Sequence, residues 1–101
     1  MKIRINKLNF IIELKKILAV VGNNPINPIL ANMLIVAEQN ELALYGSNEL
    51  ISVKIIINEN ISIEKSGKCL ISAKTFIGII EKLNENEFEI EMIDSILRIK
   101  S

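Results

Sequence analysis

We expect the chain to fold as one α+β domain over residues 1–101, with two helices packed on one side of mainly antiparallel sheets. Three observations predict this class. Apolar residues recur at helical spacing in segments 7–21 and 73–83, whereas most other segments alternate apolar and polar residues as strands do. Pro25 and Pro28 stand between the first helical segment and the strands, and they favour an extended chain there. A length of 101 residues fits one domain with its own core.

The first two elements follow from a change of period at residue 7. Residues 1–6 alternate and predict a short strand that buries Ile3 and Ile5. Residues 7–21 then place their large apolar side chains on one side of a helix, namely Phe10, Ile11, Leu14, Ile17, Leu18 and Val21. Asn6 is the expected N-cap and Gly22 the expected stop, so the helix should lie between them.

The middle of the chain predicts short strands separated by polar turns. Strands are expected over 33–38, 41–45, 49–58, 61–64 and 69–72. Turns are expected at 39–40, 46–48 and 58–60, and a polar loop at 65–68. The strand over 49–58 carries Leu50 and Ile56 on the face opposite its other apolar residues. One of its ends is therefore expected to be covered on both faces.

The last third of the chain predicts a second helix and a closing hairpin. The helix should run over 73–83 with Phe76, Ile77, Ile80 and Leu83 inward, and a turn should follow at 84–87. The hairpin is expected around Asp94-Ser95, with Phe88, Ile90, Met92, Leu97 and Ile99 facing the core. The helical pattern from Phe10 to Ile17 is echoed from Phe76 to Leu83, which indicates two related halves in one domain.

Composition argues against an enzyme. The formal net charge is zero, the chain has no histidine, and its one cysteine, Cys69, is expected to be a buried apolar residue. The glycines are isolated, so no phosphate-binding loop is predicted, and no spacing suits a metal ion or another cofactor. Glu89 and Glu91 alternate on one strand face; a solvated face explains them better than a catalytic carboxylate pair. We expect a cytoplasmic protein without a membrane span.

Several motifs together point to a family. They are the Met-Lys-Ile start, Pro-Ile-Leu-x-Asn-x-Leu at 28–34, Leu-Tyr-Gly-Ser-Asn-Glu-Leu at 44–50, Ser-Ala-Lys at 72–74 before Phe76, and Leu-Arg-Ile-Lys-Ser at 97–101. In this order and spacing the chain resembles the first domain of the bacterial DNA polymerase III β subunit, the sliding clamp. Asn48 stands where aspartate is usual in that family, and Asn24 where many clamps have arginine.

The resemblance implies a β-α-β-β-β unit repeated twice, here with the last strand missing, in a three-domain chain. Two such chains would form a ring around duplex DNA that makes the replicative polymerase processive. It also implies DNA-facing positions on the helices and the adjoining loop, at Lys15, Lys16, Asn23, Asn24, Lys74 and Lys82. Polymerase and clamp loader would bind only through domains absent from this chain, and its open sheet edge would favour self-association.

The alternative is a small stand-alone α+β protein-interaction module without a DNA role. Its likeness to clamps would come from aliphatic composition and Asn-rich turns. Continuation of the sequence beyond Ser101 into two more domains of the same element order would separate the two hypotheses.

Overall fold

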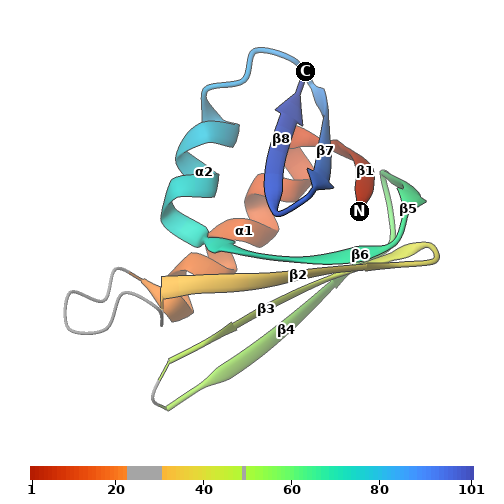
Figure 1. Cartoon of the computed structure of the whole chain (residues 1–101). Coiled ribbons are helices and arrows are strands. Elements are labelled where there is room, and N and C mark those ends of the chain that lie inside the picture. Colours follow the sequence, from red (N-terminus) through yellow and green to blue (C-terminus); the bar gives the residue numbers. More distant parts are fainter. Residues whose placement is uncertain (23–30, 49) are drawn as a thin grey trace.

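The computed structural model describes residues 1–22, 31–48 and 50–101 as two helices and eight strands (Figure 1). The elements are, in chain order, β1 Lys2–Asn6, α1 Lys7–Val21, β2 Asn32–Glu38, β3 Glu41–Ser47, β4 Ser52–Ile57, β5 Ile61–Lys65, β6 Gly67–Ser72, α2 Ala73–Glu81, β7 Glu87–Ile93 and β8 Ile96–Lys100. The expected class, α+β with two helices on antiparallel sheets, is confirmed.

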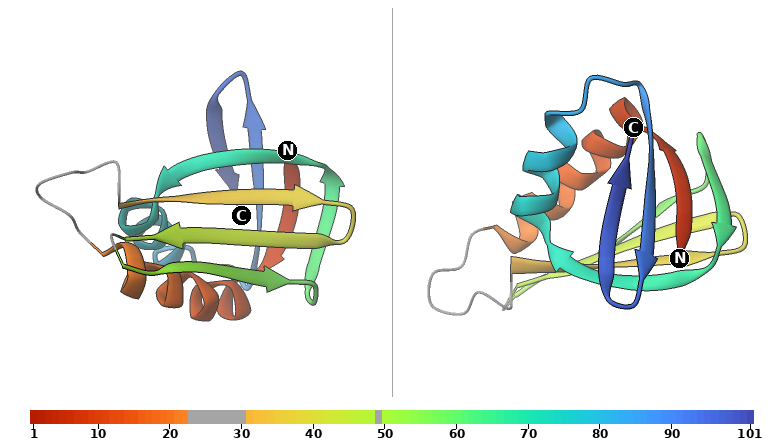
Figure 2. Two further views of the ribbon diagram at one scale, coloured as in Figure 1. Left: turned by 90° about the horizontal axis from the view of Figure 1, so that it is seen from below. Right: turned by 45° about the horizontal axis from the view of Figure 1, so that its top comes forward.

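The strands form two four-stranded sheets. Sheet I has the order β5-β1-β7-β8 and sheet II the order β4-β3-β2-β6, and every pairing between neighbours in these sheets is antiparallel. Strands from the two halves of the chain pair with each other. In sheet I, β1 pairs with β7, and in sheet II, β6 pairs with β2. Figure 2 shows the two sheets from two further directions.

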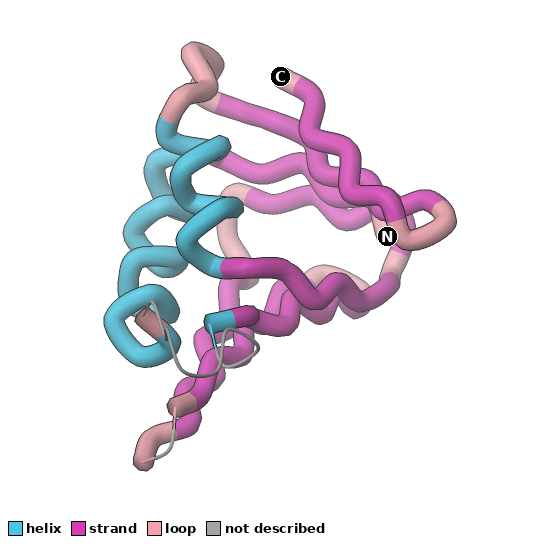
Figure 3. Tube along the Cα trace, turned by 60° about the vertical axis from the view of Figure 1, so that its left-hand side comes forward, coloured by secondary structure: helices cyan, strands magenta, loops and turns pink. Residues whose placement is uncertain are grey.

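The helices form a layer of their own, side by side on one flank of the sheets (Figure 3). The two phenylalanines of the sequence echo, Phe10 and Phe76, pack against each other between the helices and the core. The rings of Phe10 and Phe76 pack edge to face with centroids 5.9 Å apart, and Phe88 of β7 packs against Phe10 at 5.8 Å. All three rings are fully buried, as expected, within a core that is otherwise aliphatic.

The limits of α1 are those that the sequence predicts. The Asn6 side chain accepts a hydrogen bond from the backbone N–H of Asn9 at 3.2 Å, which caps the first turn. Gly22 has a φ of 57° and its N–H donates to the Leu18 carbonyl at 2.7 Å. A residue with a side chain would be strained at that φ, so glycine ends the helix here.

Several boundaries differ from the sequence expectation. The turn expected at 46–48 is wrong in part, because β3 continues to Ser47; β4 begins only at Ser52. The loop expected at 65–68 is wrong too, because β5 ends at Lys65 and β6 begins at Gly67. The second helix ends at Glu81, two residues early. Pro25 and Pro28 lie outside the described residues.

The expected cover on both faces of β4 is not provided by the residues that the structure describes. Leu50, beside the strand, is 92% exposed and Ile56 is 46% exposed, whereas Ile57 faces the core. Neither described helix is long and apolar enough to span a membrane.

Candidate nucleic-acid interface

The exposed side of α1 carries two of the predicted DNA-facing lysines. The helix buries Phe10, Leu14, Ile17 and Val21, so Lys15 and Lys16 are left in solvent on its other side. Lys16 Nζ lies 3.2 Å from a carboxylate oxygen of Glu13, one turn earlier. This exposed pair partly neutralises its own charge, so Lys15 presents the less compensated cation.

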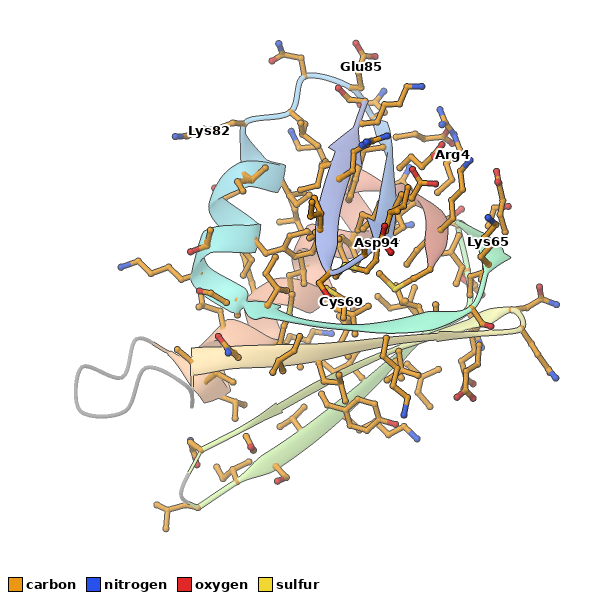
Figure 4. All side chains as sticks on the ribbon, viewed as in Figure 1. Arg4, Lys65, Cys69, Lys82, Glu85 and Asp94 are labelled. Atoms are coloured by element: carbon orange, nitrogen blue, oxygen red, sulfur yellow. The ribbon has the colours of Figure 1, made fainter. Side chains whose placement is uncertain are left out.

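The other two predicted DNA-facing lysines, Lys74 and Lys82, lie at the two ends of α2. Ser72 caps the helix by accepting a hydrogen bond from the Thr75 N–H at 3.3 Å, and the next residue but one, Lys74, is exposed in the first turn. Lys82 follows the last helical residue and is also exposed. In Figure 4 its side chain points away from α2, on the side of the molecule opposite Arg4 and Lys65.

The Lys7 side chain connects the two helices at one end. Lys7, the first residue of α1, donates from Nζ to the carbonyl oxygens of Leu83 and of Glu81, the latter at 3.4 Å. A cation at the C-terminus of α2 satisfies carbonyls that have no partner inside the helix and favours the helix dipole. The beginning of α1 therefore lies against the end of α2, and the helices are antiparallel neighbours.

The lysines share this surface with apolar side chains that sequence reasoning did not place there. Leu8 is 66% exposed, Ile12 56% and Ile79 43%. Leu8 and Ile12 are spaced one turn apart on the side of α1 opposite its buried stripe, a pattern that a helical projection of the sequence could have revealed. The two helices therefore expose aliphatic side chains as well as lysines.

The positive field of this surface is modest. Lys15 and Lys16 share α1 with Glu13, Lys74 shares α2 with Glu81, and Lys82 directly follows Glu81. The remaining predicted residues, Asn23 and Asn24, lie outside the described residues. What the four lysines offer is several cations on one helical layer without a preformed pocket, which suits contact with phosphate oxygens and not the reading of bases.

Carboxylates gather elsewhere, on the outer face of sheet I. Lys2 Nζ lies 3.5 Å from both Glu64 and Glu89, and Glu91 is 4.0 Å from Arg98. The charge of Glu64, followed by that of Glu89, raises the pKa of the half-buried Lys2 amine. Glu89 and Glu91 are thus members of ion pairs on a solvated face, as the sequence indicated.

The cysteine is buried, as expected. Cys69 in β6 is 3% exposed, and burial raises the pKa of its thiol because an apolar environment disfavours the thiolate. Among the residues that the structure describes, no group of three or more His, Cys, Asp or Glu could hold a metal ion.

The whole chain, residues 1–101, matches the family model described as "DNA polymerase III beta subunit, N-terminal domain". The chain belongs to this family. A curated relative, the Beta sliding clamp of Mycoplasma genitalium, is 36% identical over 106 residues, which cover 100% of this chain and 27% of the relative. The chain therefore spans about a quarter of the length of that clamp.

Solved clamp structures share the fold over the full chain. The beta subunit of Streptococcus pyogenes DNA polymerase superimposes with a TM-score of 0.94 at 26% identity, covering 100% of this chain and 28% of that one. The Bacillus subtilis sliding clamp gives 0.92 at 29% identity with the same coverage. The two sheets and the helical layer are therefore those of a DNA-clamp domain.

Proposed function

We propose that this chain serves as the first domain of a three-domain DNA sliding clamp, a ring that encircles duplex DNA and keeps the replicative polymerase on its template. The observation that carries the proposal is the layer of two antiparallel helices with Lys15, Lys16, Lys74 and Lys82 exposed on it. Lysines that touch phosphates attract DNA without reading sequence, and a ring that slides needs that kind of contact. Family membership supports the same function.

The proposal assigns no catalysis to this chain. In clamps generally, the partners that do chemistry are separate proteins, and we place polymerase and clamp-loader contacts in parts of the relatives that this chain does not span. We also propose that the protein works in the cytoplasm. The alternative, a stand-alone interaction module without a DNA role, is not favoured, because the family model matches the chain from its first residue to its last.

The DNA-facing surface can be tested by measuring how tightly the 101-residue chain binds a short DNA duplex, with binding monitored by NMR. Four phosphate contacts would give a slope of log K against log salt of about −3 to −4. The double variant Lys15→Glu/Lys74→Glu should lower the affinity and bring the slope to about −2, because two of those contacts are removed.

The matched control is Lys54→Glu/Lys68→Glu, which changes the net charge equally but lies on the outer face of sheet II. The control should bind the duplex as the unchanged chain does, apart from the general effect of net charge. Equal losses in the two double variants would reject the helical layer as the DNA-facing surface. Normal binding by the Lys15→Glu/Lys74→Glu variant would reject it as well.

A further inference from the structure

Lys7 stands at the end of α1 where a positive charge is unfavourable for that helix. It is the first helical residue, and the first turn of α1 contains no acidic residue. The N-terminus of a helix carries a partial positive charge, so a carboxylate stabilises it and a cation does not. The preferences of α1 itself therefore do not explain a lysine at this position.

The C-terminal end of α2 has the opposite defect. Its last turn contains Glu81 and no basic residue, although the C-terminus of a helix carries a partial negative charge. Lys82, which follows, has a φ of −86° and so provides no left-handed stop of the glycine type. Its side chain points away from the helix in Figure 4. Carbonyl groups at such an end need a hydrogen-bond donor from elsewhere in the molecule.

Lys7 supplies this donor from the other helix. Its Nζ donates to the carbonyl oxygen of Leu83 and to that of Glu81, the latter at 3.4 Å. Its backbone N–H donates to the carbonyl oxygen of Asn86 at 2.8 Å. The connection between α2 and β7 thus holds Lys7 by its backbone and by its side chain. The half-buried Lys7 therefore acts as the C-terminal cap that α2 lacks in its own sequence.

The Lys7 contact also sets which residues of the two helices lie level with each other. The helices lie side by side in Figure 3 and are antiparallel, because the start of α1 contacts the end of α2. Positions counted forward from Lys7 and backward from Glu81 therefore run in the same direction. At about 1.5 Å per residue, Lys15 lies about 12 Å along α1 from Lys7, and Lys74 lies about 10.5 Å along α2 from Glu81.

The aromatic contact between the helices agrees with this alignment. Phe10 lies about 4.5 Å along α1 from Lys7, and Phe76 lies about 7.5 Å along α2 from Glu81. Their ring centroids are 5.9 Å apart, so residues at similar levels do meet across the two helices. The two lysines differ in level by only about 1.5 Å, and the same two contacts keep them aligned.

We propose that Lys7 is a positioning residue of the DNA-facing surface. This inference rests on the function proposed above. The Lys7 amine caps α2 from α1 and holds the exposed cations of the two helices at fixed levels, so that the surface meets phosphates without first having to be ordered. Lys7 itself is assigned no phosphate contact, because two carbonyl oxygens engage its amine.

Three substitutions of Lys7 separate its amine from its charge. Lys7→Met removes the amine and keeps an unbranched apolar side chain, whereas Lys7→Arg keeps a cation with several donors. Lys7→Gln keeps a neutral and shorter donor, and it replaces Lys7→Met if that variant does not fold. The matched control is Lys68→Met, which removes one charge from an exposed position on the outer face of sheet II.

Two quantities are measured by NMR for each variant. The first is the affinity for the short duplex at a fixed salt concentration. The second is the hydrogen-exchange rate of the Lys82 and Leu83 amides, whose N–H groups donate to the carbonyl oxygens of Ile79 and Ile80 at 3.1 Å. These amides report on the last turn of α2, which Lys7 caps.

We expect Lys7→Met to speed the exchange of these two amides about tenfold, because the charged donor at the end of their helix is lost. It should also weaken duplex binding about threefold to tenfold, and Lys7→Arg should reverse most of both effects. Lys68→Met should leave exchange unchanged and weaken binding by less than about twofold. Added to Lys15→Glu/Lys74→Glu, Lys7→Met should weaken binding by less than about twofold further, because the cations that it positions are already gone.

Faster exchange with unchanged affinity in Lys7→Met would overturn the positioning role, because the contact would then serve stability alone. Equal losses of affinity in Lys7→Met and Lys68→Met would overturn it too, since net charge would explain both. A full further loss on top of Lys15→Glu/Lys74→Glu would make Lys7 a direct phosphate contact instead. If the unchanged chain does not bind the duplex, the proposed function fails and the positioning role with it. If the unchanged chain binds and exchange in Lys7→Met stays normal, only the positioning role fails.

Discussion

Gly46 lies in β3 where the strand passes beneath α1. A Cβ atom at this position would lie 2.9 Å from Ile17 Cγ2 and 3.0 Å from Val21 Cγ1. Both methyl groups belong to β-branched side chains that are buried, so neither can turn away freely. The absence of a side chain at Gly46 therefore determines how closely α1 can approach sheet II.

Replacement of Gly46 by alanine should destabilise the chain by about 1–3 kcal/mol, because an added methyl overpacks a filled contact. Urea unfolding followed by circular dichroism measures the change. An unchanged or raised midpoint would show that α1 can shift away from the strand at little cost.

Asn48 explains why the turn after β3 starts later than the sequence suggested. Its Oδ1 accepts hydrogen bonds from the N–H groups of Leu50 and Ile51, each at 2.8 Å. Its Nδ2 donates to the carbonyl oxygen of Val20 at 3.1 Å, which holds the turn against the end of α1. A glycine and a serine before an asparagine indicated a turn, but the contact with α1 keeps both of them in the strand.

At the scale of elements, the inner side of α2 is buried in the core, whereas its outer side is exposed and carries a glycine. Ala73, Phe76, Ile77 and Ile80 are buried, and these positions are the helical pattern that predicted the element. Gly78 lies on the exposed side, and a Cβ there would have no described neighbour within 4 Å. A glycine inside a helix adds conformational freedom to the unfolded chain without any compensating contact here.

Replacement of Gly78 by alanine should therefore stabilise the chain by about 1 kcal/mol. The same urea measurement applies, and the comparison with Gly46→Ala is informative because the chemical change is identical and the expected sign is opposite. A lower midpoint for Gly78→Ala would mean that the exposed side of α2 has a contact that this account lacks.

At the scale of the whole molecule, the edge of sheet I at β8 is open among the described strands. β8 pairs with β7 on one side, and none of the described strands pairs with its other side. Leu97 and Ile99 bring half-buried apolar side chains to this edge. An open edge with apolar residues offers its backbone groups to another strand.

We expect the chain to self-associate through such edge-to-edge pairing at high micromolar concentration. Sedimentation velocity over a range of concentrations measures this directly, and the mean mass should rise above that of one chain. A strictly monomeric species over the whole range would contradict the expectation.

Fold class and helix positions could be predicted from this sequence because they depend on local signals. Phe10, Leu14, Ile17 and Val21 recur at a helical period, and Asn6 and Gly22 act within one turn of the helix that they limit. The class followed from the balance of two such helices with alternating strands. Among the candidate DNA-facing residues, the exposure of Lys15, Lys16, Lys74 and Lys82 follows from the same periods; their contact with DNA stays a prediction.

By itself, the sequence determined which residues face inward within each element, because side-chain direction is set by the period of the element. Only the tertiary structure decided where β3 ends and β4 begins, which strands β1 and β6 pair with, and that α1 and α2 share one layer. The reason is physical: Gly46 and Asn48 act through α1, and β1 and β6 find partners far away in the chain. Such long-range contacts leave no periodic signal in the residues that make them.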